Sequence, residues 1–351
     1  MTWIAKPKLH HPTLTCNALG YTRRDYEGKV STLCAGCGHD SISAAIVQAC
    51  WELDIEPHRV AKLSGIGCSS KTPDYFLGPA HGFNTVHGRM PSVLTGANLA
   101  NRSLIYLGVS GDGDSASIGL GQFAHAIRRG VAMTYIVENN GVYGLTKGQF
   151  SATADRGALS KRGAANGDEA IDMVGLALQL GATFVARSFS GDKAQLVPLL
   201  RAAMRHDGFS LIDVISPCVT FNDHEGSTRS YAYAREHYEE AVHADFVPFA
   251  AEIAVDYADG AAQTVTLHDG SRIVLRKVAA DYDPSDPGVA LDAIQQRMRR
   301  GEYLTGLLHI ARDAADIHAL GATPDTPLNA IPYESLSPGG DALRRVLDAF
   351  R

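Results

Sequence analysis

The sequence contains no long hydrophobic run and no block of like charge. No stretch reaches the roughly 20 apolar residues that a helix needs to span a bilayer, and the first residues lack the apolar core of a secretory signal. The net charge of −6 comes from 38 acidic and 32 basic residues scattered along the chain, which leaves no basic surface for nucleic acid or anionic lipid. We therefore expect a cytoplasmic protein with small-molecule or protein partners, and with no nucleic-acid or membrane partner.

Internal repeats and low-complexity segments are also absent. The 351 residues are 45% hydrophobic and 20% charged, an ordinary composition for a globular protein with a large core. Only six residues are cysteines. Cysteines rarely form disulfides in a reducing compartment, so any that cluster are better interpreted as metal or redox ligands.

Apolar, β-branched segments alternate with helical patterns along the first two thirds of the chain. The apolar segments are residues 59–64, 104–110, 131–137 and 210–216. This alternation predicts an α/β fold with a doubly wound, mostly parallel sheet. In such sheets ligands bind where the strands end at the carboxyl edge. Polar and cysteine-containing motifs follow each of these segments, so we expect them to meet there.

The pattern changes after about residue 235. Residues 264–275 indicate a β-hairpin around a tight Asp-Gly turn. Six prolines break the remaining tail into short pieces, with one helix expected over residues 289–300. We therefore predict a main domain over residues 1–235 and a C-terminal hairpin extension over residues 236–351, which we interpret as structural or partner-binding.

Residues 111–114 form a Gly-Asp-Gly-Asp turn directly after an expected buried strand. The glycines permit a tight turn and let backbone N–H groups approach phosphate oxygens. The Asp112 carboxylate would repel a diphosphate unless a divalent cation lay between them, and Mg²⁺ accepts protein oxygens together with phosphate oxygens. Asn140 ends the next strand and can supply an amide oxygen, with the Val142 carbonyl next in line. The turn therefore predicts a magnesium–diphosphate site.

A dinucleotide site is the alternative for this turn. Residues 111–116 fit the glycine fingerprint of dinucleotide-binding folds, and Glu138 could bind a ribose hydroxyl. That fingerprint gives no role to Asp112 or Asn140. A Gly/Asp turn that binds nothing is the third interpretation.

Cys34 and Cys37 form a CxxC motif, which suits a zinc site, a redox pair or an iron–sulfur cluster. A redox pair needs no further cysteine, and zinc normally brings a second CxxC or a pair of histidines. A four-iron cluster needs two more thiolates, which can be distant in sequence. Cys68 and Cys218 each follow an expected strand and fit this last case. The two remaining cysteines are interpreted as a surface thiol and a core residue: Cys16 and Cys50.

These motifs resemble a known family in residue type, order and spacing. The matching blocks are LCAGCGH at 33–39, SGIGCSSK at 64–71, HGR at 87–89, GDGD at 111–114 and NNGVYGLTKGQ at 139–149. Over about residues 30–230 the chain resembles the β subunits of 2-oxoacid:ferredoxin oxidoreductases, most closely the 2-oxoglutarate type. The hairpin tail is similar to that of the longer β subunits.

The resemblance implies thiamine diphosphate, Mg²⁺ and a 4Fe–4S cluster as cofactors, and makes residues 1–235 a thiamine diphosphate-binding domain. The implied ligands of Mg²⁺ are Asp112, Asn140 and the Val142 carbonyl, and those of the cluster are Cys34, Cys37, Cys68 and Cys218. The other implied cofactor-binding residues are Gly67, Ser69, His87, Gly88, Gly111, Gly113, Asp114, Tyr143, Gly144, Leu145 and Thr146. Contacts with substrate or coenzyme A are expected from Lys71, His87 and Lys147.

Enzymes of this family decarboxylate a 2-oxoacid on thiamine diphosphate, transfer the acyl group to coenzyme A and reduce ferredoxin through the cluster; in reverse they carboxylate an acyl-CoA. The resemblance implies that 2-oxoglutarate is the substrate, with Lys71 facing its second carboxylate. It also implies an α subunit that supplies a glutamate to the thiamine, in an assembly of two αβ pairs. Three alternatives stay open: pyruvate or another 2-oxoacid as substrate, a cluster-free thiamine-dependent decarboxylase or synthase, and a zinc-stapled binding protein.

Overall fold

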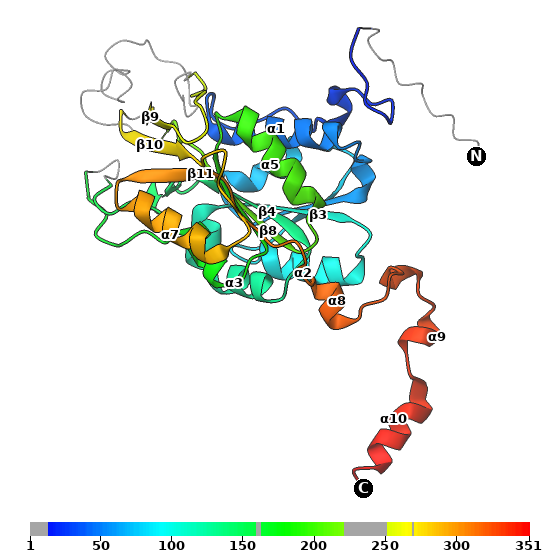
Figure 1. Ribbon diagram of the computed structural model, residues 1–351. Helices are drawn as coiled ribbons and strands as arrows, with labels where there is room; N and C mark the ends of the chain where they lie inside the picture. Colours follow the sequence, from blue (N-terminus) through cyan, green and yellow to red (C-terminus); the bar gives the residue numbers. More distant parts are fainter. Residues whose placement is uncertain (1–12, 159–162, 221–250, 269) are drawn as a thin grey trace, which may run out of the picture.

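A nine-stranded sheet runs through the protein in the order β2-β1-β3-β4-β8-β7-β11-β10-β9 (Figure 1). The computed structural model describes residues 13–158, 163–220, 251–268 and 270–351. The strands of this sheet are β1 (Val60–Ser64), β2 (His81–Asn84), β3 (Ile105–Gly111), β4 (Met133–Asn139), β7 (Phe184–Phe189), β8 (Phe209–Ile215), β9 (Ala262–Thr266), β10 (Arg272–Lys277) and β11 (Glu302–Ile310). A separate two-stranded hairpin pairs β5 (Val142–Tyr143) with β6 (Gln149–Phe150).

Helices cover both faces of the sheet, which confirms the doubly wound fold expected from the sequence (Figure 1). One face carries α1 (Gly38–Glu52) and α5 (Lys193–Arg205). The other carries α2 (Met90–Ala100), α3 (Leu120–Arg128), α4 (Met173–Gln179) and α7 (Pro287–Met298). Each face buries its own apolar cluster against the central strands. The short 3₁₀ or π segments are η1 (Arg23–Tyr26), η2 (Pro57–Arg59), η3 (Ser69–Asp74), η4 (Gly113–Ile118) and η5 (Leu328–Ala330).

The strands that carry the predicted motifs run parallel and end at one edge of the sheet. Ser64 of β1 pairs with Val109 of β3, and Gly111 of β3 pairs with Glu138 of β4. Strand β4 pairs in parallel with β8 up to Ile215. This register brings the segments after β1, β3, β4 and β8 to the same edge.

The C-terminal extension adds three strands to this same sheet. The expected hairpin is confirmed as the antiparallel pair β9 and β10. Strand β11, which the sequence pattern did not indicate, pairs in parallel with β10 and antiparallel with β7. The boundary placed at residue 235 lies outside the described residues, and the division into two domains stays a prediction.

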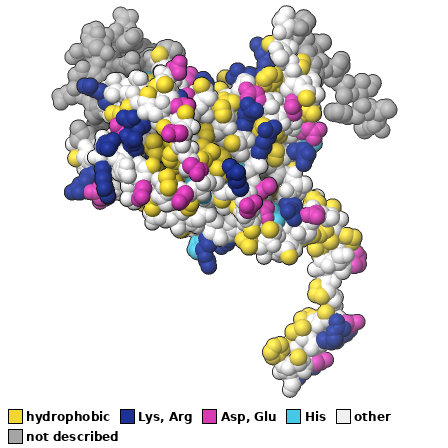
Figure 2. Space-filling view, in the orientation of Figure 1, with side chains coloured by type: hydrophobic (Ala, Val, Ile, Leu, Met, Phe, Trp, Pro, Cys, Tyr) yellow, Lys and Arg dark blue, Asp and Glu magenta, His cyan; other side chains and the backbone are white. Residues whose placement is uncertain are grey.

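The chain ends in an arm that runs away from the sheet and its helices (Figure 1). It contains α9 (Tyr333–Leu336) and α10 (Gly339–Asp348) and follows α8 (Ile317–Gly321), which packs against the core and donates from the Ile317 N–H to the Gly130 carbonyl at 2.8 Å. Apolar side chains lie exposed along it, among them Leu343 and Phe350 (Figure 2). In the part of the chain that the structure describes, no helix combines the length and the apolar character needed to cross a membrane.

Candidate active site

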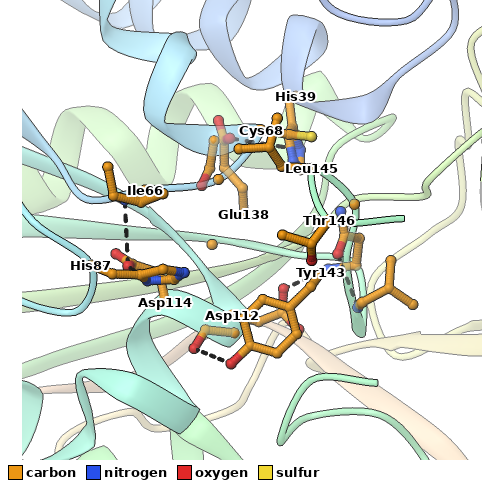
Figure 3. Close-up of a pocket in the computed structure, with 17 residues that line it drawn as sticks. His39, Ile66, Cys68, His87, Asp112, Asp114, Glu138, Tyr143, Leu145 and Thr146 are labelled. Atoms are coloured by element: carbon orange, nitrogen blue, oxygen red, sulfur yellow. Dashed lines mark hydrogen bonds and ion pairs between the residues drawn. The ribbon is translucent and has the colours of Figure 1, made fainter. Parts of the chain in front are cut away.

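A cleft lies at the sheet edge where β1, β3 and β4 end (Figure 3). Most residues predicted to bind the cofactors line it: Gly67, Cys68, Ser69, His87, Gly111, Asp112, Gly113, Asp114, Asn140, Val142, Tyr143, Gly144, Leu145 and Thr146. Three more lining residues are outside the set that the resemblance implies: His39, Ile66 and Glu138. The fold therefore brings motifs distant in sequence into one cavity, as the strand-end argument predicts.

Asp112 is buried at the start of η4 and faces the cleft. Its Oδ2 accepts hydrogen bonds from the hydroxyls of Ser151 and Thr153, the latter at 2.6 Å. In the part of the chain that the structure describes, its Oδ1 receives only a long contact of 3.4 Å from the Asn140 N–H. Burial raises the pKa of Asp112 against the opposing effect of these hydrogen bonds. A cation at Oδ1 would stabilise the ionised carboxylate, so this residue fits the magnesium site expected from the sequence.

The glycines beside Asp112 allow close packing that a larger residue would prevent. A Cβ atom added at Gly113 would lie 2.5 Å from the ring of Tyr143. The Tyr143 hydroxyl in turn donates to the Gly113 carbonyl at 3.0 Å. The glycines add no side chains of their own to the turn, and the Tyr143 ring packs directly against one side of it. Bare backbone at these positions lets a phosphate approach main-chain N–H groups.

The Asp114 carboxylate is hydrogen-bonded to other residues of the chain and does not face a ligand as a free carboxylate. Its oxygens accept hydrogen bonds from the Ser110 hydroxyl at 2.6 Å and from the Gly88 N–H at 2.7 Å. The Nδ1 atom of His87 also contacts this carboxylate. Asp114 therefore fixes His87 at the rim of the cleft and leaves Nε2 as the nitrogen that can meet a ligand (Figure 3). Gly88, predicted at the cofactor, contributes through this contact rather than as a lining residue.

The β5–β6 hairpin forms another wall of the cleft. Asn140 accepts a hydrogen bond from the Val142 N–H at 3.1 Å, which holds its amide oxygen beside the strand end. Leu145 and Thr146 follow on the hairpin loop and are exposed at the cleft surface. The hairpin therefore places the two remaining predicted magnesium ligands next to Asp112.

A buried polar network lies at the inner end of the cleft. The Thr72 hydroxyl donates to Oε2 of Glu138 at 2.9 Å. The same oxygen lies 3.7 Å from Nδ1 of His39, and Nδ1 is 2.7 Å from the Ser216 hydroxyl. All four side chains are buried. Only the position of Glu138 at a strand end could have signalled this network, because its partners come from three other segments.

Burial decides the protonation of this network. It raises the pKa of the Glu138 carboxyl well above its ordinary value and lowers the pKa of His39 to about 4. His39 is therefore neutral at pH 7, and burial favours the protonated form of Glu138. The Oε1 atom of Glu138 has no partner among the described residues, and Glu138 lines the cleft. A ligand that fills the cleft can hydrogen-bond to this oxygen.

The four predicted cluster cysteines come from three segments at the same edge of the sheet. Cys37 is the N-cap of α1, Cys68 precedes η3 and Cys218 follows β8. Burial raises the pKa of Cys37 and of Cys68, and a second cysteine adds to each rise, Cys218 for Cys37 and Cys34 for Cys68. Cys37 is therefore within electrostatic range of Cys218, and Cys68 within electrostatic range of Cys34. The two other cysteines are placed as expected, one exposed and one buried: Cys16 and Cys50.

Two kinds of metal site are open to these cysteines, a single zinc ion and an iron–sulfur cluster. Within the described residues, no three His, Cys, Asp or Glu side chains lie close enough together to hold a single metal ion. A zinc ion needs its ligands within bonding distance of one point. A cluster is several atoms across, so its ligands lie further apart. The 4Fe–4S cluster and the zinc site therefore both stay predictions for these cysteines.

The two lysines expected at substrate or coenzyme A lie outside the set of lining residues. Lys71 is exposed on η3, close in sequence to Cys68, which does line the cleft. Lys147 is exposed on the β5–β6 loop with a positive φ of 80°. Long lysine side chains can reach beyond the surface they stand on. Their roles stay predictions.

Comparison with known protein families supports the cofactor interpretation. Residues 65–214 match the family model of the thiamine pyrophosphate enzyme C-terminal TPP-binding domain. A solved structure of a 2-oxoglutarate:ferredoxin oxidoreductase from Magnetococcus marinus, with 2-oxoglutarate, coenzyme A and succinyl-CoA bound, is similar with a TM-score of 0.70 and 27% identity. The similarity covers 96% of this chain and 99% of that one.

Named relatives give the same result. A 2-oxoacid:ferredoxin oxidoreductase subunit beta from Saccharolobus solfataricus is 42% identical over 211 residues, which are 60% of this chain and 67% of that protein. The 2-oxoglutarate oxidoreductase subunit KorB from Mycobacterium tuberculosis is 33% identical over 355 residues, which cover 94% of this chain and 92% of the relative. The second alignment therefore includes the C-terminal extension as well as the cleft.

Proposed function

Because the chain belongs to the family of 2-oxoacid:ferredoxin oxidoreductase β subunits, we propose that it is the β subunit of a 2-oxoglutarate:ferredoxin oxidoreductase. The enzyme would convert 2-oxoglutarate and coenzyme A to succinyl-CoA and CO₂, with two electrons passing one at a time to ferredoxin. The observation that carries the substrate is the alignment with a 2-oxoglutarate subunit over 94% of this chain. The same site would also catalyse the reverse reaction, the reductive carboxylation of succinyl-CoA.

The residues of the cleft fit the first two proposed cofactors. Oδ1 of Asp112, the Asn140 amide oxygen and the Val142 carbonyl would hold Mg²⁺, and the 111–114 turn would hold the diphosphate. Thiamine diphosphate supplies the carbanion chemistry that decarboxylation requires. The Tyr143 hydroxyl stabilises the turn through its hydrogen bond to the Gly113 carbonyl.

The cysteines would hold the third cofactor, with ligands Cys34, Cys37, Cys68 and Cys218. A 4Fe–4S cluster supplies single-electron transfer to ferredoxin. Cys68 lines the cleft that the turn also lines, so one of the four proposed cluster ligands shares a cavity with the diphosphate residues. This arrangement favours the oxidoreductase over a cluster-free thiamine decarboxylase.

Membership of a β-subunit family implies a partner subunit. We propose that an α subunit covers the cleft and completes the thiamine site, in an assembly of two αβ pairs. Exposed apolar side chains at the cleft support this, because Val86 is 70% exposed next to His87 and Leu145 is 52% exposed on the hairpin loop. Ferredoxin as acceptor and a cytoplasmic location stay predictions.

Anaerobic assay of the chain co-purified with its partner tests the proposed function. We expect methyl viologen reduction that depends on coenzyme A and on 2-oxoglutarate, and about four irons per chain. Comparison with pyruvate and an aryl-pyruvate decides the substrate class. Pyruvate as the faster substrate would replace 2-oxoglutarate in this proposal, and an iron-free, zinc-containing protein would contradict it altogether.

A further inference from the structure

Asp112 binds two hydroxyls through one of its oxygens and almost nothing through the other. Ser151 and Thr153 both donate to Oδ2, whereas among the described residues Oδ1 has only the 3.4 Å contact with the Asn140 N–H. A carboxylate oxygen with two hydroxyl donors has little capacity left for a cation. The direction in which Asp112 can bind a metal is thus set by these two side chains.

The loop that carries the hydroxyls is itself tied to the other predicted magnesium ligands. The Ser151 N–H donates to the Gly141 carbonyl at 3.1 Å, and Gly141 lies between Asn140 and Val142. The buried Asn166 side chain donates to the Ala154 carbonyl at 2.9 Å and holds the loop from its other end. The hydroxyls and the strand-end ligands are therefore parts of one hydrogen-bonded unit.

Strand β11 of the C-terminal extension reaches the same loop. The Tyr303 hydroxyl donates to both carboxylate oxygens of Asp155 at 3.0 and 2.9 Å. The Tyr303 ring also lies under the guanidinium of Arg187, 5.9 Å from its central carbon. Because Asp155 is two residues beyond Thr153, the extension supports the loop at the point where it approaches Asp112.

From these contacts we infer that Ser151 and Thr153 are positioning residues of the magnesium site, holding Oδ2 of Asp112 so that Oδ1 faces the cation. This rests on the proposed function, since it takes Mg²⁺ with thiamine diphosphate as the ligand. The two residues touch neither the substrate nor the diphosphate in this role. Their effect should appear in the Mg²⁺ concentration that the site requires.

The test is a Mg²⁺ titration of the complex with its partner, freed of Mg²⁺ by a chelator and held at saturating thiamine diphosphate. Binding is followed by the rise in thermal midpoint. We expect Thr153→Val to raise the half-saturating Mg²⁺ concentration about tenfold, as the loss of one hydrogen bond to a charged group implies, and the Ser151→Ala/Thr153→Val pair to raise it more. Tyr303→Phe should raise it by about twofold to fivefold, because one support of the loop is lost.

Rescue variants and a matched control separate positioning from general stability. Thr153→Ser keeps the hydroxyl and should stay within about twofold of wild type. Thr95→Val removes a buried hydroxyl on α2, which donates to the Pro91 carbonyl at 2.6 Å away from the cleft, and should leave the Mg²⁺ requirement unchanged. Thermal midpoints without Mg²⁺ show how far each variant alters the fold itself.

The outcomes distinguish this inference from the function on which it rests. If the wild type requires Mg²⁺ and the double variant requires the same Mg²⁺ concentration, the positioning role is overturned and the proposed function stands. A Thr153→Ser variant as impaired as Thr153→Val would also overturn it, because the hydroxyl would then not be the cause. Wild type that binds thiamine diphosphate without Mg²⁺ would overturn both the metal site and the inference.

Discussion

The Thr72 hydroxyl donates a 2.9 Å hydrogen bond to Oε2 of Glu138 and so links η3 to the end of β4. Both side chains are fully buried, and Oε1 of Glu138 has no partner in the described part of the chain. Segment η3 follows Cys68, and the end of β4 precedes Asn140. One buried hydrogen bond thus joins the segment of a proposed cluster ligand to that of a proposed magnesium ligand.

Loss of this hydrogen bond should destabilise the fold. We expect Thr72→Val to lower the free energy of unfolding by about 1–3 kcal/mol, because Glu138 is then a buried carboxyl with little hydrogen bonding at either oxygen. Thr72→Ser keeps a hydroxyl at the same place and should lose much less. Denaturant unfolding of the two variants measures the difference, and equal stability of both would show that the hydroxyl is dispensable.

Lys62 provides a prediction about pH. Its buried ammonium donates to the carbonyls of Pro73, Phe76 and Leu77 at 2.5, 2.5 and 3.0 Å, below the segment that carries Lys71 and Thr72. Burial lowers the pKa of Lys62 to about 8, from 10.5 in the unfolded chain. Between these two values the unfolded chain binds more protons at this residue than the folded chain does. The contribution of Lys62 to stability is therefore lost as the pH falls through 8 and is fully present above 10.5.

A Lys62→Met variant isolates this dependence. We expect the difference in unfolding free energy between wild type and variant to shift in favour of wild type as the pH rises from 8 to 10.5. Lys29 is the matched control, because its hydrogen bond with Asp74 raises its pKa and gives the opposite sign. A pH-independent difference for Lys62→Met, measured by denaturant unfolding across this range, would contradict the prediction.

The strand-end positions of the motifs could be predicted because they depend on parallel-strand geometry alone. Strands β1, β3, β4 and β8 each end in an apolar segment followed by a polar or cysteine-containing motif, and the carboxyl ends of parallel strands meet at one edge. The same reasoning placed Asp112 and Asn140 side by side. What the structure adds is which oxygen of each side chain is already occupied by the protein.

Strands β7 and β11 and the polar network around Glu138 are examples of features that the sequence pattern could not predict. Strand β7 contains Arg187 at its centre, which reads as an exposed residue until Asp172 and Asp213 are seen to pair with it. Strand β11 contains Gly306, with a φ of 124°, and its register opposite β7 shifts between Leu307 and His309. Pairing between His39 and Glu138 depends on tertiary contact between residues 99 positions apart, for which local sequence carries no signal.

Lys71 tests the proposed choice of substrate. If its ammonium meets the second carboxylate of 2-oxoglutarate, Lys71→Ala should raise the KM for 2-oxoglutarate about tenfold and leave the KM for pyruvate nearly unchanged. Lys29→Ala is the control, since Lys29 is an exposed lysine paired with Asp74 at the far end of η3. Equal increases for both oxoacids would assign Lys71 to the fold or to coenzyme A instead.

The cysteines give the last prediction, because the structure divides all six into two groups. The four predicted ligands lie on segments at the carboxyl edge of the sheet, whereas Cys16 is exposed in a separate segment before α1. Single replacement of any of the four by serine should lower the iron content well below about four per chain and weaken the visible absorption that dithionite bleaches. The four variants to compare are Cys34→Ser, Cys37→Ser, Cys68→Ser and Cys218→Ser.

Cys16→Ser is the matched control and should keep the iron content of wild type. A cluster with three remaining protein ligands can persist in part, so iron analysis should be paired with the absorption spectrum of the reduced and oxidised protein. Thiamine diphosphate binding should survive in Cys218→Ser, because Cys218 is not among the residues that line the cleft. If Cys16→Ser lost as much iron as Cys37→Ser, the assignment of the ligands would be wrong.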